Sequence, residues 1–180
     1  MSFKQEAQRD HGAGRSFLVK RVEWGARPSP KFVNLTTPVD NIIIHHTTGD
    51  SSTTPSANAS AVRYHQRQHI DHEHRIDIAY NFLVGEDGKA YEGRGWNAEG
   101  EHSVGRNANS IGIALIGDYS DSMPNNEALD AIRALISMGV AYGNIKEEYK
   151  LKIHHETENN NNKDNACLGE KLCEELKTWP

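Results

Sequence analysis

Short apolar runs, separated by polar turns, set the hydrophobic pattern of the first two thirds of the chain. Residues 41–46 are rich in β-branched side chains and lie between turn-forming residues, which is typical of a buried strand. Residues 78–84 and 89–92 flank a Glu-Asp-Gly turn and predict a β-hairpin. Residues 110–117 are the most apolar run and predict a central strand, with two glycines where backbones approach closely. Together these runs predict most of one sheet.

Helical spacing and polar loops account for the remaining segments. Apolar residues recur every three or four positions over residues 126–142, which predicts a helix that ends at Gly143. A loop rich in Ser, Thr, Asn and Pro precedes a polar, weakly amphipathic helix expected over residues 59–70. A further strand is expected over residues 149–155. A short final helix is expected to turn two leucines inward, Leu172 and Leu176.

The order of these elements predicts an α/β fold. Strand, helix, hairpin, strand, helix, strand and helix follow one another, which favours a single domain with a central mixed β-sheet flanked by helices. Residues 1–17 are polar and interrupted by glycines, so we expect a flexible arm there and the domain over residues 18–180. Since sites in such folds usually lie at strand ends, we expect a groove in that position.

Composition excludes several classes of protein. The chain has 180 residues, 36% of them hydrophobic, and a net charge of −5, so it lacks the basic excess of a nucleic-acid-binding protein. No run approaches the ~18 apolar residues of a membrane span, so we expect a soluble monomer without membrane insertion. Residues 1–15 have mixed charge and no apolar segment, which predicts that there is no signal peptide.

Histidines are unusually frequent, with 10 in the chain, and two pairs stand at predicted strand ends. His45 and His46 close the first strand, His154 and His155 close the last, and Cys167 follows the next loop. Two imidazoles and a thiolate suit zinc with an open fourth position. The residues alone leave an alternative equally open, in which the histidines are polar strand terminations and the cysteine is a core residue.

Several segments, in order, resemble the family of peptidoglycan recognition proteins and type 2 N-acetylmuramoyl-L-alanine amidases. The similarity extends from about Val22 to Leu176, and the stretch around His154 looks closest to the small amidase lysozymes of short-tailed phages. The matching segments are WGAR at 24–27, IIHHT at 43–47, DIAYNF at 77–82, YEGRGW at 91–96, EHS at 101–103 and the stretch 107–113.

This resemblance implies one zinc ion per chain, held by His45, His154 and Cys167. His155, beside the second ligand, is the weaker candidate for that position. The interval from His154 to Cys167 is longer than the family's usual spacing, and the run of four asparagines at 159–162 accounts for the excess as a loop insertion of low entropic cost.

The resemblance also implies two catalytic side chains. Tyr80 matches the family's catalytic tyrosine, whose phenol stabilises the developing oxyanion, and its alternative reading is an ordinary strand aromatic. The phage enzymes have a lysine two positions before the metal cysteine, where this chain has Asn165. Lys163 is the candidate for that role, and a solvated loop lysine is an equally good interpretation of it.

Further residues are expected to line the substrate groove. Arg94 stands where an arginine can meet the carboxylates of a stem peptide, or it is a surface charge. A separate histidine group at 65, 69, 72 and 74 is interpreted as a solvated helix face, not as a second metal site. The predicted groove residues are His46, Arg94, Trp96, His102 and Asn107.

The function implied is hydrolysis of the amide between N-acetylmuramic acid and L-alanine in peptidoglycan. A phage endolysin of this kind is made in the cytoplasm of an infected bacterium and acts on the cell wall after release, and a cytoplasmic enzyme that recycles wall fragments is the other setting. The alternative function is a recognition protein that binds peptidoglycan without cutting it. Because such proteins typically lack the cysteine ligand, Cys167 together with Tyr80 favours the enzyme.

Overall fold

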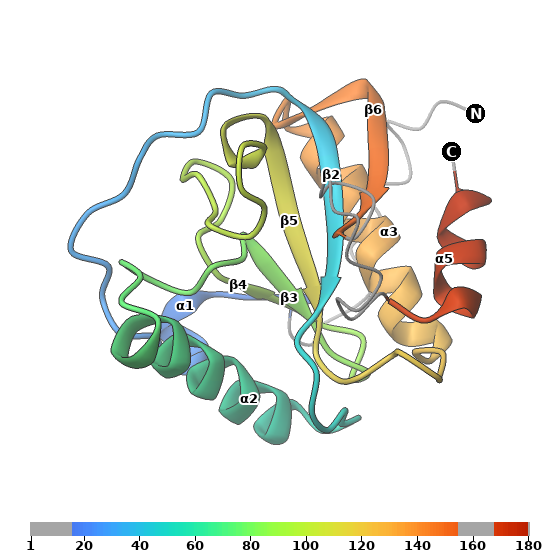
Figure 1. Cartoon of the computed structure of the whole chain (residues 1–180), viewed down its shortest axis with the longest axis horizontal. Helices are drawn as coiled ribbons and strands as arrows, with labels where there is room; N and C mark the ends of the chain where they lie inside the picture. The colour runs from blue at the N-terminus through green and yellow to red at the C-terminus, as the bar shows by residue number, and fades with distance from the viewer. Residues whose placement is uncertain (1–15, 155–167, 180) are drawn as a thin grey trace.

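The computed structural model describes residues 16–154 and 168–179, and within them six strands form one sheet (Figure 1). The spatial order is β1-β4-β3-β5-β2-β6. Every neighbouring pair is parallel except β3 and β4, which form the predicted antiparallel hairpin. The strands are β1 (Leu18–Val19), β2 (Val39–His46), β3 (Phe82–Val84), β4 (Ala90–Glu92), β5 (Ser110–Leu115) and β6 (Ile145–Ile153).

Helices cover both faces of this sheet, which confirms the predicted α/β fold with a central mixed sheet. In Figure 1, α1 and α2 lie on one side of the sheet, and α3 and α5 lie on the other. No helix of the described part is long and apolar enough to cross a membrane. The helices are α1 (Arg21–Trp24), α2 (Pro55–Arg67), η2 (Gln68–His72, a π-helix), η3 (Asn107–Asn109, a 3-10 helix), α3 (Asn126–Ala141) and α5 (Glu170–Lys177).

The two faces of the central strands carry side chains of different size. On β2 and β5, Ile42, Ile44, Ile111 and Ile113 pack into the core beneath α3 and α5. Successive side chains of a strand point to opposite faces, so Gly112 and its neighbour Ala114 face the α2 side. In the parallel register Ala114 stands beside His45 of β2. Small residues on this face leave room for ring side chains, and the candidate site lies there.

Four expected elements agree closely with the structure. The strand predicted at 41–46 begins earlier, at Val39, and the one predicted at 110–117 ends at Leu115. The helix predicted at 126–142 spans Asn126–Ala141, and Gly143 follows it with a φ of 73°, a left-handed conformation that favours glycine. In α5 both predicted leucines are buried.

The strand predicted at 149–155 is shifted toward the N-terminus. β6 begins at Ile145 and ends at Ile153, because it pairs with β2 from Val39 to Ile44. His154 therefore follows the strand and does not belong to it. His155 lies outside the described residues, as do residues 156–167.

The strand predicted at 78–84 is wrong in its first half, since only Phe82–Val84 forms a strand. The carbonyls of residues 78–81 are occupied by a different partner, the loop at 93–101. Its amides at Gly93, Arg94 and Glu101 donate to Asn81, Tyr80 and Ala79. The alternation of polar and apolar residues within a short segment could not identify this loop as the hydrogen-bonding partner. Residues 78–81 therefore form an irregular segment at the centre of the candidate site.

The polar helix predicted at 59–70 begins earlier and changes type at its end. Pro55 at the first helical turn starts α2, a position where its missing N–H costs nothing. After Arg67 the chain continues as the π-helix Gln68–His72. A π-turn holds more residues than an α-turn and therefore changes the direction of the side chains that follow, and such segments occur often at functional sites.

Candidate functional site

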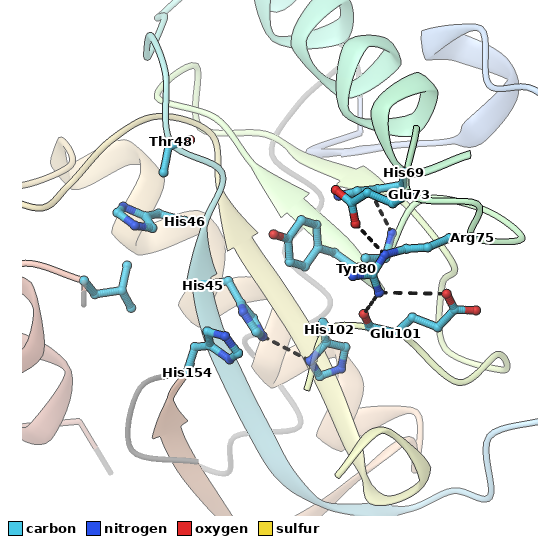
Figure 2. Close-up of a pocket in the computed structure, with 12 residues that line it drawn as sticks. His45, His46, Thr48, His69, Glu73, Arg75, Tyr80, Glu101, His102 and His154 are labelled. Carbon is cyan, nitrogen blue, oxygen red and sulfur yellow. Dashed lines mark hydrogen bonds and ion pairs between the residues drawn. The ribbon is translucent and has the colours of Figure 1, made fainter. Parts of the chain in front are cut away.

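A cavity of about 350 Å³ opens on the α2 side of the sheet, where β2 and β6 end (Figure 2). Its lining comes from six separate parts of the chain: the end of β2, the π-helix and turn after α2, the irregular segment before β3, the loop before β5, the residue after β6 and the residues before α5. The lining residues are His45, His46, Thr48, His69, Glu73, Arg75, Ala79, Tyr80, Glu101, His102, His154 and Leu168.

Three imidazoles meet at the floor of the cavity. His45 Nε2 lies 3.0 Å from His102 Nδ1, the contact drawn as a dashed line in Figure 2. The ring centroid of His45 lies 4.5 Å from that of His154, with a tilt of 36° between the planes. His45 and His102 are 4% and 7% exposed. The structure thus brings together two of the predicted zinc ligands and one predicted groove residue.

Two glycines make room for His102. A Cβ atom at Gly112 of β5 would lie 2.3 Å from the Cδ2 atom of His102, and a Cβ at Gly100 would lie equally close. Any larger residue at either position would displace the ring. The glycine expected to allow close backbone approach in the central strand therefore allows the approach of an imidazole.

Burial keeps the imidazoles of His45 and His102 uncharged. Desolvation lowers the pKa of His45 well below its ordinary value, and His102 and His154 lower it further. Burial, followed by repulsion from His154, lowers the pKa of His102 to about 3. Neutral imidazole is the form that can offer a bare nitrogen to a metal ion.

Tyr80 lies on the irregular segment before β3 and projects between two histidines (Figure 2). Its ring centroid is 5.2 Å from that of His45 and 5.6 Å from that of His69. Burial raises the pKa of Tyr80 to about 12, so its phenol remains protonated at neutral pH and can donate a hydrogen bond. Tyr80 therefore lies beside His45, the first of the predicted zinc ligands.

His69 is a cavity residue that the sequence interpretation missed. It was assigned to a solvated helix face, and that assignment is wrong for this residue because it is only 7% exposed and lines the cavity. Its Nδ1 accepts a hydrogen bond from the backbone N–H of Ala79, next to Tyr80. The i, i+4 spacing of His65 and His69 indicates that the two side chains share one helix face. The sequence pattern does not show the π-helix Gln68–His72, which affects where that face points.

Charged side chains form the outer rim of the cavity. Arg75 Nε lies 2.7 Å from a carboxylate oxygen of Glu73, and its guanidinium also donates to the backbone carbonyl of Glu101. The Glu101 carboxylate lies 2.9 Å from Arg94. Positive and negative groups alternate along this rim, so it suits a polar ligand with both kinds of hydrogen-bonding group.

Arg94 has a role different from the predicted one. Its side chain is only 5% exposed and is absent from the cavity lining. The guanidinium donates to the backbone carbonyls of Ile78, Glu99 and Asp77. Because its donors are committed to these carbonyls and to the Glu101 carboxylate, Arg94 supports the segment that carries Tyr80 and is not free to meet a ligand carboxylate.

Trp96 also lies away from the predicted groove wall. Its ring packs 4.4 Å from that of Phe82, and Gly139 of α3 leaves room for it on the opposite side of the sheet. Asn107, another predicted groove residue, accepts hydrogen bonds at Oδ1 from the backbone N–H groups of His102 and Ser103. It shapes the loop that carries His102 and does not line the cavity.

His46 lines the cavity, as the sequence predicted for a groove residue. Its Nδ1 accepts a hydrogen bond from the backbone N–H of Tyr119, and its Nε2 is buried with no partner among the described residues. Burial lowers the pKa of His46, while the nearby Asp118 carboxylate acts in the opposite direction. His46 therefore presents an uncharged imidazole at this end of the cavity.

The described residues fit the predicted metal site in part. His45 and His154 supply two adjacent imidazoles, and that of His45 is neutral, as zinc requires. Within residues 16–154 and 168–179, no group of three His, Cys, Asp or Glu side chains is arranged to hold a metal ion. The third predicted ligand, Cys167, lies outside this part of the chain, as does Lys163.

Comparison with known proteins agrees with this fold. The model of the N-acetylmuramoyl-L-alanine amidase family matches residues 35–174, and the chain belongs to that family. Peptidoglycan recognition protein 1 of Mus musculus is 36% identical over 91% of this chain and 88% of its own length. Peptidoglycan-recognition protein LE of Drosophila melanogaster is 38% identical over 92% of this chain, which spans 47% of that relative.

Solved structures show the same architecture. The crystal structure of peptidoglycan recognition protein-LE in complex with tracheal cytotoxin, a monomeric diaminopimelic acid-type peptidoglycan, aligns with a TM-score of 0.85 at 38% identity. That alignment covers 92% of this chain and 95% of the other. Drosophila PGRP-LB aligns with the same TM-score at 35% identity, over 91% of this chain and 94% of that one. The predicted family is thereby confirmed.

Proposed function

We propose that this protein is a zinc-dependent N-acetylmuramoyl-L-alanine amidase that hydrolyses the amide between N-acetylmuramic acid and L-alanine in peptidoglycan. The observation that carries the proposal is the position of Tyr80, whose protonated phenol lies against His45 at the floor of the cavity. A hydrogen-bond donor in a buried site can stabilise the oxygen of an amide carbonyl as that oxygen gains negative charge.

In this proposal His45, His154 and Cys167 hold one zinc ion. When bound, zinc supplies Lewis-acid chemistry: it polarises an amide carbonyl and makes water a better nucleophile at neutral pH. Tyr80 donates its O–H to the carbonyl oxygen during attack. Lys163 would assist at the same oxygen. His69 and Arg94 bind the backbone beside Tyr80 and so hold the segment that places its ring against His45.

A non-catalytic recognition protein is the second candidate function. It is favoured by the names of the relatives, which are peptidoglycan-recognition proteins, and by the tracheal cytotoxin bound to one of them. We propose peptidoglycan or its muropeptide fragments as the ligand in both cases. Synthesis in the cytoplasm and action on the bacterial wall after release, as in phage lysis, is the setting proposed for the enzyme, and the animal origin of these relatives supports recognition more than lysis.

The two functions differ in the products of peptidoglycan digestion. We expect the purified, zinc-loaded chain to release free L-alanine amino termini from cell walls, measured by amine labelling and mass spectrometry of the fragments. Tyr80→Phe should lower kcat by about 10²- to 10³-fold, since it removes one oxyanion donor. Cys167→Ser and His45→Ala should abolish cleavage.

Tyr64→Phe is the matched control, because Tyr64 is half exposed on α2 and absent from the cavity lining, and it should cleave as the wild type does. Muropeptide binding is measured in parallel by calorimetry. Binding without new amino termini in the wild type would reject the amidase and support the recognition protein.

A further inference from the structure

The contact between His45 and His102 is a hydrogen bond between two buried, uncharged rings. Their planes are nearly perpendicular, at 80°, and the two nitrogens are 3.0 Å apart. Two nitrogens this close need one proton between them, because two bare nitrogens repel each other and so do two N–H groups. One ring must donate and the other must accept.

Two arrangements of the protons are possible. In the first, Nε2–H of His45 donates to Nδ1 of His102, and Nδ1 of His45 is bare. In the second, His102 donates from Nδ1, and the proton of His45 resides on its own Nδ1. Since Nε2 of His45 is occupied by His102, only Nδ1 remains to share a metal ion with His154, whose ring lies 4.5 Å away. A metal ion needs this nitrogen bare, which selects the first arrangement.

The second ring nitrogen of His102, Nε2, is consistent with the first arrangement of the protons. Its Nε2 is buried, on a residue that lines the cavity, and has no hydrogen-bond partner among the described residues. In the first arrangement this nitrogen carries a proton and is a donor. The oxygen of an amide carbonyl is an acceptor only, so a cavity that binds an amide gains from a donor at this position.

The ring of His102 is fixed in place by its surroundings. Asn107 Oδ1 accepts from the backbone N–H groups of His102 and Ser103, at 3.1 and 2.9 Å, and so anchors the loop. Gly100 and Gly112 lie against the ring so closely that neither position has room for a Cβ atom. Because the ring is held by backbone on two sides, its Nδ1 stays in a fixed position beside Nε2 of His45.

We propose that His102 is a positioning residue, which accepts the N–H of His45 at Nδ1 and thereby fixes the tautomer of His45 that presents a bare Nδ1 to a metal ion. The metal part of this inference rests on the proposed zinc site. The hydrogen bond itself does not, because the contact, the two glycines and Asn107 are present without an ion, whereas its direction is chosen by the metal. Partners of this kind typically contribute about 10- to 100-fold to metal affinity.

The test uses the full chain, labelled with ¹⁵N and freed of metal with a chelator at pH 7.5. Long-range ¹H–¹⁵N spectra report which ring nitrogen of each histidine carries the proton. We expect a single tautomer of His45 in the wild type, with the proton on Nε2, and a mixture of tautomers in His102→Ala. Zinc affinity, measured by competition with a chromophoric chelator, should fall by about 10- to 100-fold in His102→Ala.

His102→Asn is the rescue variant, since its amide oxygen can occupy the place of Nδ1 and accept the same N–H. It should restore the single tautomer and most of the zinc affinity, which a loss of packing alone would not allow. His72→Gln, an exposed histidine of η2, is the matched control and should leave both measurements unchanged.

A proton on Nδ1 of His45 in the wild type would overturn the inference, as would a single tautomer and undiminished zinc affinity in His102→Ala. Failure of the proposed function would look different. If the wild type bound no zinc, the amidase proposal would fail, while the spectra of the wild type and His102→Ala would still decide whether His102 fixes the tautomer.

Discussion

At the residue scale, Asn81 connects the sheet to the segment that carries the candidate site. It directly precedes β3 and is fully buried. Its amide nitrogen donates to the carbonyls of Gly95 and Ala98, each at 2.9 Å, and its Oδ1 accepts from the N–H of Gly112, also at 2.9 Å. One side chain thereby joins the strand beneath His102 to the loop that binds the backbone of Tyr80.

Replacement of Asn81 should destabilise the fold more than any single exposed substitution. Asn81→Ala leaves three buried backbone groups without a partner, and we expect a loss of about 3 kcal/mol in the free energy of unfolding. Urea denaturation followed by circular dichroism measures it. Asn97→Ala, at an exposed position of the same loop, should change the free energy by less than about 0.5 kcal/mol. Equal losses in the two variants would contradict the role of Asn81.

At the scale of the element, the transition from α2 to the π-helix η2 decides which histidines become buried. His69 turns into the cavity, and His65, one α-helical turn earlier, is partly buried beside it, with ring centroids 6.4 Å apart. Burial and repulsion from His69 lower the pKa of His65 to about 4, although the Glu73 carboxylate acts in the opposite direction. His72, on the same element, is exposed.

This burial should make the fold sensitive to acid. The unfolded chain binds a proton at His65 near pH 6.5, whereas the folded chain does so only near pH 4. Above about pH 6.5 His65 is neutral in both states, and its burial does not lower the free energy of unfolding. As the pH falls toward 4, the unfolded chain is stabilised by the proton it binds, and the free energy of unfolding falls. After allowance for partial exposure, we expect a loss of roughly 1–2 kcal/mol from this residue.

The measurement is the free energy of unfolding between pH 7.5 and pH 4 in the presence of a chelator. His65→Gln should show a shallower pH dependence than the wild type, and His72→Gln should follow the wild type. An identical slope in His65→Gln and the wild type would refute the assignment.

At the scale of the whole molecule, the candidate site joins segments that lie far apart in the chain. His45 is the penultimate residue of β2, Tyr80 precedes β3, His102 lies on the loop before β5, and His154 follows β6. A ligand that binds several of them at once stabilises the folded state, because the unfolded chain does not hold them together. Metal binding in the proposed site should therefore be visible in global stability.

Removal of zinc should lower the melting temperature. Free zinc at 100 times its Kd adds about 2.7 kcal/mol, which corresponds to roughly 5–10 °C for a chain of this size. Scanning calorimetry with zinc and with a chelator measures the difference. His45→Ala and Cys167→Ser should melt at one temperature under both conditions, and His72→Gln should keep the wild-type difference. A wild type whose melting temperature is unaffected by zinc would count against the metal site.

The sequence by itself determined the order of the elements, the mixed sheet and the placement of His45 at a strand end, because these follow from hydrophobic period and turn chemistry, which are local. It also identified the family through motifs distributed over most of the chain. Tyr80 was found in the same way, although the strand predicted around it is an irregular segment.

Only the tertiary structure decided which side chains share the cavity. Arg94 and Trp96 stand in a family motif, yet one binds backbone carbonyls and the other packs beneath α3. His69 enters the cavity because of a π-turn, and His102 meets His45 across 57 residues of chain. Contacts of this kind depend on strand register and on the space left by glycines in neighbouring segments, which a local pattern of residues does not encode.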